Sequence, residues 1–319
     1  MAPLVRLLAV ALLAASQLAS AQTYPNRAIK LVVPFGPGGS ADAIARPLAE
    51  KLTAALGQPV VVENKPGGLT VVGADLVAKS APDGYTLFFM PGTHVLTPVM
   101  VQNTPYNPIA DFTPIAYLGA QPYYLYANTQ QPFATLPEMI AYGKANPGKV
   151  TMGVSDSVTL VIASAFKSAA NLDFTIVPYK GGGPQNADFV GNQIGMAVGT
   201  PNMMQFVTSG KARALSVTTP ARVPFAPQVP TIAELVPGSN FNVTTWYAVA
   251  GPAKLPRPIV ERLHAEIRKA MDDPEMRKRL DDQGVVKPAD TSPEALAAVM
   301  KDYQERMTTL IKAAGIKPE

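Results

Sequence analysis

The stretch "PFGPGGSADAIAR", residues 34–46, places glycines and prolines between an apolar run and an expected helix. Such a turn presents unpaired backbone N–H groups and the positive end of a helix dipole, which together suit an anion. Phosphate and carboxylate are the two candidates. A tight turn without a ligand also explains Gly38 and Gly39 if either has a positive φ.

Two further features favour an anion over an empty turn. Residues 64–68, "NKPGG", form a second glycine-rich loop after an expected strand, and residues 153–157, "GVSDS", are rich in hydroxyls between an expected strand and helix. The second of these stretches belongs to the second half of the chain. Two helix starts that face each other across a cleft would grip an anion from both sides.

Dinucleotide binding is the first alternative. The spacing Gly36-x-Gly38-x-x-Ala41 satisfies the loose dinucleotide fingerprint, and Glu63 ends the next expected strand, where a ribose-binding acid would lie. Pro37 in the turn argues against an oxidoreductase built on the Gly36–Gly38 turn. No Lys follows the glycines, so a phosphate-binding P-loop fits less well still.

An exported hydrolase is the second alternative. The pattern Gly153-x-Ser155-x-Ser157 is one residue from a nucleophile elbow, and Asp188 and His264 supply the Ser, Asp, His order of that fold. However, His264 lies among charged residues on the polar face of an amphipathic helix. We therefore expect no catalytic residue and no enzyme activity.

Composition removes several other classes of site. The chain has 2 histidines and no cysteine, which excludes thiol catalysis, disulfides and cysteine metal sites. With His94 and His264 as the only histidines, a zinc site is not expected. We expect neither a metal nor a cofactor.

Apolar periodicity alternates between strand and helix in the first part of the chain. Residues 28–33 are typical of a buried strand, and apolar residues recur every four positions from Ile44 to Leu56 before Gly57 ends that helix. A further helix is expected at 72–80, between strands at 59–63 and 85–90. This order predicts a doubly wound, mainly parallel sheet.

The pattern restarts after a Pro- and Tyr-rich stretch at 117–128. Helices are expected at 136–145, 161–170, 186–190 and 203–209, and strands at 149–153, 174–178, 194–198 and 212–218. Another apolar run, 246–250, precedes amphipathic helices at 258–271 and 293–313. The α/β chain is thus expected to form two lobes: 22–121 with 247–319, and 122–246. Hinge crossings are expected near 120–128 and 242–250.

Residues 1–21 have the features of a signal peptide. Arg6 precedes an apolar run from Leu7 to Ala15, and Ala19-Ser20-Ala21 has the small-x-small form of a cleavage site. We expect a mature, exported chain that starts at Gln22. The full chain has 27 Lys and Arg, and removal of Arg6 with the signal peptide leaves 26 against 23 Asp and Glu. This net charge is too small to indicate nucleic-acid binding.

Several motifs occur in one order and cover nearly the whole mature chain: "YPNRAIKLVVPFGPGGSADAIARPLAEKL", "GQPVVVENKPGG", "KSAPDGYTL", "KANPGKV", "VPYKGGGP", "VPTIAEL" and "WYAVAGPAKLPRPIVERLHAEIRKAM". With them the chain resembles the receptor family of tripartite tricarboxylate transporters, also called Bug proteins. The resemblance implies a two-lobed, periplasmic-binding-protein-like fold and a non-enzymatic receptor. It also implies a small carboxylate ligand, membrane transporter subunits as partners, and the periplasm as location. We expect a monomer.

The resemblance also implies site residues. In the family two loops act as a pincer on a ligand carboxylate, and the first loop matches Phe35 to Asp42 here. Backbone N–H groups of Gly38, Gly39 and Ser40 are expected to hold the anion, with Phe35 as a wall of the pocket. Asp42 is expected to brace the loop. Thr93 and His94 match the family's Gly-Thr-His segment at the edge of the cleft.

The second pincer loop matches the stretch that starts at Gly153, and here the chain departs from the family. It reads Gly-Val-Ser-Asp-Ser-Val-Thr, with Ser155, Asp156 and Ser157, and it lacks the family's following His. Val198-Gly199-Thr200 replaces the family's Phe-Asp-Asn, and Thr200 is a further expected contact. The ligand type thus stays open among dicarboxylates, aromatic acids and amino acids.

Asp156 allows two interpretations. A carboxylate beside a bound carboxylate is electrostatically unfavourable, so Asp156 either caps the following helix or meets a ligand that carries an amine or hydroxyl. The pattern favours the cap.

Overall fold

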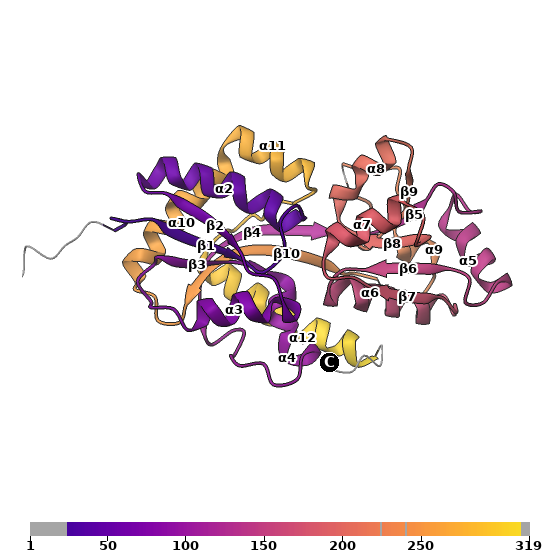
Figure 1. Cartoon of the computed structure of the whole chain (residues 1–319), viewed down its shortest axis with the longest axis horizontal. Coiled ribbons are helices and arrows are strands. Elements are labelled where there is room, and N and C mark those ends of the chain that lie inside the picture. Colours follow the sequence, from indigo (N-terminus) through magenta and orange to yellow (C-terminus); the bar gives the residue numbers. More distant parts are fainter. Residues whose placement is uncertain (1–23, 224, 240, 314–319) are drawn as a thin grey trace, which may run out of the picture.

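The computed structural model describes residues 24–223, 225–239 and 241–313, and the expected signal peptide at 1–21 lies outside them. These residues form two five-stranded sheets with helices on their faces, side by side in Figure 1. The predicted two-lobed α/β fold is therefore confirmed. No helix in the described part of the chain combines the length and the apolar character needed to cross a bilayer.

Lobe 1 is built around the sheet order β2-β1-β3-β10-β4. Its strands are β1 (Ile29–Val33), β2 (Val60–Asn64), β3 (Thr86–Pro91), β4 (Phe112–Pro122) and β10 (Thr244–Pro252). Its α-helices are α2 (Ser40–Leu56), α3 (Val71–Ala78), α4 (Thr97–Met100), α10 (Arg257–Asp272), α11 (Pro274–Asp282) and α12 (Pro293–Ala313), and short 3₁₀ helices are η1 (Gly68–Thr70) and η2 (Gly92–Leu96).

Lobe 2 repeats this arrangement with the order β7-β6-β8-β5-β9. Its strands are β5 (Tyr124–Asn128), β6 (Thr151–Val154), β7 (Thr175–Pro178), β8 (Met196–Gly199) and β9 (Ala212–Val217). Its helices are α5 (Leu136–Ala145), α6 (Ser157–Ala169), α7 (Gly182–Val190), α8 (Met204–Thr208), α9 (Ile232–Leu235) and the 3₁₀ helix η3 (Pro201–Met203).

Each sheet contains one antiparallel strand, a direction that apolar periodicity does not predict. β10 runs antiparallel to β3 and β4, and β5 runs antiparallel to β8 and β9. β4 leads into β5 through Tyr123, and β10 begins at Thr244 where the chain returns from lobe 2. The segments expected to link the lobes are therefore strands of the two sheets.

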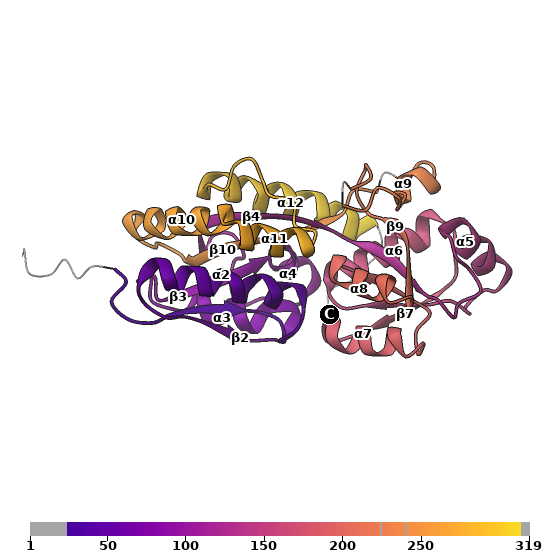
Figure 2. The same cartoon turned by 90° about the horizontal axis from the view of Figure 1, so that it is seen from above.

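The C-terminal helices complete lobe 1 and reach lobe 2. α10 packs against α2 and β4, and α12 packs against β4 and also against α6 of lobe 2. Figure 2 shows α12 along one face of lobe 1 with its C-terminal part beside lobe 2. One apolar core accordingly includes Phe88 and Trp246 of lobe 1, Phe166 of lobe 2 and Met300 of α12.

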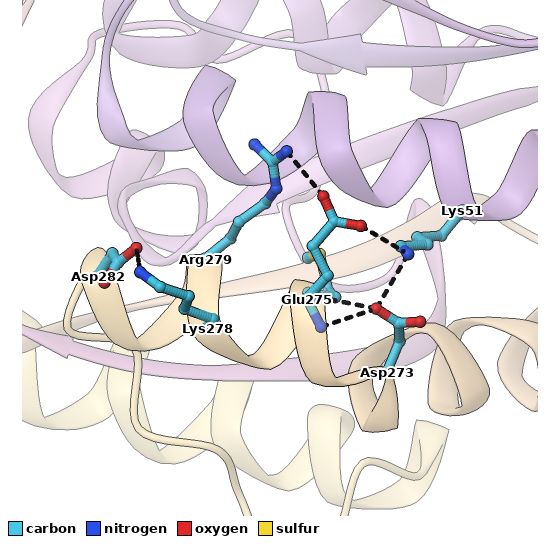
Figure 3. Close-up of polar contacts among 7 residues, drawn as sticks. Lys51, Asp273, Glu275, Lys278, Arg279 and Asp282 are labelled. Carbon is cyan, nitrogen blue, oxygen red and sulfur yellow. Dashed lines mark hydrogen bonds and ion pairs between the residues drawn. The ribbon is translucent and has the colours of Figure 1, made fainter.

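Ion pairs connect α11 to α2 on the outer surface (Figure 3). Lys51 Nζ of α2 lies 3.0 Å from Asp273 Oδ1 and 3.1 Å from Glu275 Oε2, while Asp273 also caps α11 by accepting the Glu275 and Met276 N–H groups. Arg279 pairs with Glu275 one turn later at 3.0 Å. These contacts hold the helix whose N-terminus, at Ser40, faces lobe 2.

Candidate functional site between the lobes

A cavity of about 140 Å³ lies between the lobes. Loops at the carboxyl ends of parallel strands line it, which is where open α/β sheets place their ligands. The lining comes from residues between 35 and 41, 91 and 93, 155 and 159, 180 and 186, and 199 and 203, with Tyr123, Thr245 and Tyr247. An apolar cavity of similar size, about 150 Å³, holds a molecule as large as benzene. The space therefore suits a small ligand.

The N-terminus of α2 opens onto this cavity without a side-chain cap. Gly39 is its N-cap residue, and no side chain accepts a hydrogen bond from the first turn. Gly39, Ser40 and Ala41 line the cavity, so the dipole's positive end and first-turn N–H groups are available to an anion.

The backbone N–H of Gly38, expected to hold the anion, is engaged within the loop. Its φ of +85° requires glycine, and its N–H donates to Asp42 Oδ2 at 3.1 Å. Gly38 is not among the lining residues. This N–H therefore shapes the turn, and at the start of α2 the residues that line the cavity are Gly39, Ser40 and Ala41.

Asp42 braces the first loop, as the sequence predicts. Its carboxylate accepts hydrogen bonds from Arg46 Nε at 2.9 Å and Asn64 Nδ2 at 3.0 Å, and Asn64 Nδ2 also donates to the carbonyl of Phe35 at 2.9 Å. Burial raises the pKa of Asp42, but the bonds from Arg46, Asn64 and Gly38 outweigh it and hold the pKa below its ordinary value. Phe35 lines the cavity from this braced loop.

The second loop uses its own carboxylate to close the start of α6. Asp156 Oδ1 accepts the Thr159 N–H at 2.8 Å, and the Thr159 hydroxyl accepts the Asp156 N–H at 2.9 Å, which is a capping box. The cap predicted from sequence is therefore present. Ser155 and Asp156 line the cavity, whereas Ser157 is buried and is not among the lining residues.

A second uncapped helix start comes from the loop at 180–183, which sequence reasoning did not select. Gly181, with a φ of +103°, is the N-cap of α7, and no side chain caps that helix. Gly181 to Gly183 and Lys180 all line the cavity. The motif "KGGGP" is a glycine-rich helix start that could have indicated this loop. The sequence predicts a helix only from 186, because glycine and proline interrupt the apolar pattern before that residue.

Thr93 and His94 follow β3 but face different surroundings. Thr93 lines the cavity, and its buried Oγ1 has no hydrogen-bond partner among the described residues. His94 is fully buried and is not among the residues that line the cavity. Its ring stacks on Tyr106 and meets Phe112 edge-on, and its Nε2 lies 3.0 Å from the Pro108 carbonyl oxygen. Burial lowers the pKa of His94 to about 3, so the ring is neutral at physiological pH.

A hydrogen bond between Ser40 and Thr200 joins the lobes across the cavity. Ser40 Oγ of α2 lies 2.7 Å from Thr200 Oγ1, which also bonds Asn202 Oδ1 at 2.9 Å. The Thr200 carbonyl accepts the Tyr126 hydroxyl at 3.1 Å. The structure thus brings Ser40 and Thr200, predicted separately from the two lobes, into direct contact.

Tyr123 and Tyr247 line the cavity from the segments that pass between the lobes. The Tyr247 hydroxyl donates to Gln121 Oε1 at 3.0 Å. Burial, followed by the charge of Asp156, raises the pKa of both tyrosines, so their hydroxyls stay protonated donors. Both tyrosines lie in the segments expected as hinge crossings, 120–128 and 242–250, and no local pattern marks which side chains of a crossing strand face a cavity.

The residues of the hydrolase alternative are separated. Asp188 accepts the Tyr179 hydroxyl at 2.8 Å, and His264 lies 3.2 Å from the Thr291 hydroxyl in lobe 1. Neither bonds to Ser155, whose N–H donates to Thr159 Oγ1. In the dinucleotide alternative the expected ribose-binding acid, Glu63, pairs instead with Lys30 and Lys65.

Comparison with known proteins gives a consistent result. Residues 44–316 match the model of the tripartite tricarboxylate transporter family receptor. The protein BugT of Bordetella pertussis is 33% identical over 303 residues, which is 93% of this chain and 92% of that protein.

Solved structures agree with this. The periplasmic binding protein BugD has a TM-score of 0.87 and 31% identity, over 93% of this chain and 100% of that one. Rpa4515 of Rhodopseudomonas palustris, solved with adipate, has a TM-score of 0.88 and 30% identity over 93% and 100% of the two chains. MatC of the same organism, with bound malate, has a TM-score of 0.83 and 31% identity over 90% and 100%.

These matches exclude both enzyme alternatives, because the family consists of solute-binding receptors. The family match covers most of the chain, and both the fold and the site between the lobes accord with it. The chain is therefore a member of the tripartite tricarboxylate transporter receptor family, the Bug family of solute-binding proteins.

Proposed function

We propose that this receptor captures a small carboxylate in the cavity between its lobes and delivers it to a tripartite tricarboxylate-type transporter in the membrane. One observation carries the proposal: the uncapped N-termini of α2 and α7, from opposite lobes, line the same cavity. Helix N-termini bind anions through free N–H groups and the helix dipole. Adipate and malate, bound in two relatives of known structure, support a carboxylate as that anion.

The proposed contacts divide by role. Gly39 and Ser40 offer N–H groups from lobe 1, Thr93 and Ser155 offer hydroxyls, and Gly182 offers an N–H group from lobe 2. Phe35 forms a wall, and Asp42 positions the first loop without touching the ligand. His94 is left out because it is enclosed in its aromatic cluster.

The affinity expected from such contacts is moderate or high. Charge-assisted hydrogen bonds contribute about 1.5–3 kcal/mol each. Four or five of them reach a gross figure near the roughly 8 kcal/mol of micromolar binding. Ordering of the lobes lowers this figure, and burial of the ligand's apolar part raises it.

Binding is proposed to close the lobes by a hinge. The proposed lobes are 22–121 with 247–319 and 122–246, with bending near 120–128 and 242–250. Residues 1–21 are proposed to direct export and to be removed, so that the receptor works in the periplasm as a monomer. A closed, liganded shape would then be what the membrane subunits recognise.

A thermal-shift panel followed by calorimetry tests the proposal. Purified receptor in carboxylate-free buffer is mixed with mono-, di- and tricarboxylates, aromatic acids and amino acids, and each acid is matched by its neutral amide. Binding to the native state raises Tm by mass action. We expect at least one acid to raise Tm while its amide does not. Equal shifts from acid and amide, or no shift from any acid, would contradict the proposal.

The transport step needs a separate measurement. Uptake of the labelled acid found in the panel is compared between cells with and without the gene for this chain. We expect uptake to require the receptor, and mass spectrometry of the exported protein to show Gln22 as its first residue. Unchanged uptake in the deleted strain would show that the receptor serves another purpose than transport.

A further inference from the structure

Asp156 places a negative charge in a cavity proposed to hold an anion. Among the described residues that line the cavity, it is the one acidic side chain, and Lys180 is the one basic side chain. None of the ion pairs among the described residues involves Asp156. Within the described part of the chain, its charge therefore has no cationic partner.

Capping of α6 does not account for that charge. Asn and Ser cap helices about as well as Asp, and neither buries a charge. Asp156 is partly buried, and burial raises its pKa despite the hydrogen bonds from Thr159. The Thr159 N–H and the dipole of α6 stabilise this charge only in part, and no cationic side chain pairs with it, so a neutral cap such as Asn would avoid the remaining cost of burying a charge in the free receptor.

The positive groups lie at other parts of the same cavity. They are the N-terminus of α2 at Gly39–Ala41, the N-terminus of α7 at Gly181–Gly183, and the Lys180 ammonium at the exposed rim. Tyr247 lines the same cavity as both regions, and the charge of Asp156 helps, after burial, to raise the pKa of its hydroxyl. Positive and negative groups thus border one small space.

We propose that the ligand carries an ammonium group as well as a carboxylate, with the ammonium paired to Asp156 and the carboxylate held by the starts of α2 and α7. This inference rests on the proposed function and narrows it to amino-carboxylates. A charge-complementary cavity also rejects a plain dicarboxylate, because its second anion would meet Asp156. Asp156 is then a specificity-determining residue with a second role as a helix cap.

Matched ligand pairs test the inference. Each pair differs by one amino group, such as succinate and aspartate, glutarate and glutamate, or butyrate and 4-aminobutyrate, so that several separations of the two charges are sampled. Calorimetry is done on the intact receptor and on the variants D156N and D156S, both of which keep a capping side chain. Tm of each unliganded variant, expected to equal or exceed that of the natural receptor, verifies the fold.

We expect the natural receptor to prefer the aminated member of at least one pair by tenfold or more. D156N and D156S should lose at least tenfold in affinity for that ligand and gain affinity for the plain acid, which reverses the ranking. The inference is overturned if both folded variants keep the ligand ranking of the natural receptor, or if the natural receptor prefers the plain acid in every pair. Either result is still compatible with the proposed function as a carboxylate receptor. If no acid binds at all, the proposed function fails with it.

Discussion

Gly38 and Gly39 are adjacent, yet their backbone conformations place different demands on them. Gly38 has a φ of +85°, while Gly39 has a φ of −86°, which any residue adopts. A Cβ atom at either position would have no other atom within 4 Å. Any difference between substitutions at these two positions therefore comes from backbone strain and not from crowding.

The same substitution at both positions measures that strain. We expect G38A to lose about 1–2 kcal/mol of unfolding free energy, because an L-residue is disfavoured at this φ, and to weaken ligand binding by displacing the loop. G39A, the matched control, should keep a Tm close to that of the natural receptor. Chemical denaturation and calorimetry provide both quantities. Equal stability of the two variants would show that the turn tolerates a side chain at Gly38.

His94 shows how burial converts a titratable residue into a structural one. Its ring is neutral because burial lowers its pKa to about 3 from an ordinary 6.5. The unfolded chain therefore binds a proton between these values that the folded chain does not, and stability falls as the pH drops through this window. The loss is on the order of 5 kcal/mol by pH 3.

The variant H94F keeps an aromatic ring and removes the titration. We expect its Tm to fall less steeply than that of the natural receptor between pH 6.5 and pH 4, although its stability at pH 8 is lower because the Pro108 carbonyl loses its partner. Tm is measured against pH for both proteins. Parallel curves would show that His94 is not the group responsible.

At the scale of elements, the two helix starts of lobe 2 behave differently. α6 satisfies its first turn with Asp156 and Thr159, whereas α7 starts at three glycines with no side-chain cap. The N–H groups of α6 are thus engaged internally, and those of α7 are available to a ligand. We therefore propose that α7 supplies the lobe 2 half of the carboxylate site, although the sequence pattern pointed to the start of α6.

A carboxylate placed on α7 should compete with the ligand. G182D adds an anion at the helix start, and we expect it to weaken carboxylate binding at least tenfold through repulsion and occupation of the N–H groups. G182A is the control, since a Cβ there meets no atom within 4 Å, and it should bind within a few-fold of the natural receptor. Calorimetry with the acid from the panel decides, and unimpaired binding by G182D would move the carboxylate away from α7.

At the scale of the whole molecule, the lobes are held together by α12, by the strands that cross between them, and by the bond between Ser40 and Thr200. The strands are continuous chain and α12 is packed against both lobes, so these two connections can persist when the lobes move. The Ser40–Thr200 bond, by contrast, spans the cavity and has to break if the cavity opens. A neutral hydrogen bond contributes about 0.5–1.5 kcal/mol net. In the proposed hinge motion, this bond therefore favours the closed form without preventing opening.

Loss of this bond should speed ligand release. We expect T200V to raise the dissociation rate by about 2- to 10-fold, which corresponds to one neutral hydrogen bond. Fluorescence of Trp246, the single tryptophan of the chain, reports on the reaction in stopped-flow experiments, because it lies in β10 where the chain returns from lobe 2. T208V, at an exposed position on α8 of the same lobe, is the control. An unchanged dissociation rate in T200V would remove this bond from the closing mechanism.

The sequence by itself determined the elements whose signals are local. The prediction of a helix at 136–145 matches the bounds of α5. The regular spacing of apolar residues, which places them on one face over successive helical turns, likewise predicts α2 and α12. The first loop was also recognisable, since a glycine-rich turn between strand and helix is legible within a few residues. The same holds for the cap at Asp156, which depends on residues three positions apart.

Only the tertiary structure decided which side chains meet. β10 and β5 join sheets far from their sequence neighbours, so Tyr123 and Tyr247 became cavity residues through pairings that no local pattern encodes. His94 follows β3 as expected, but Phe112 from β4 and Tyr106 enclose it, which takes it out of the cleft. The physical reason is that helix and turn propensities act over a few residues, whereas a cavity is formed by long-range packing between lobes.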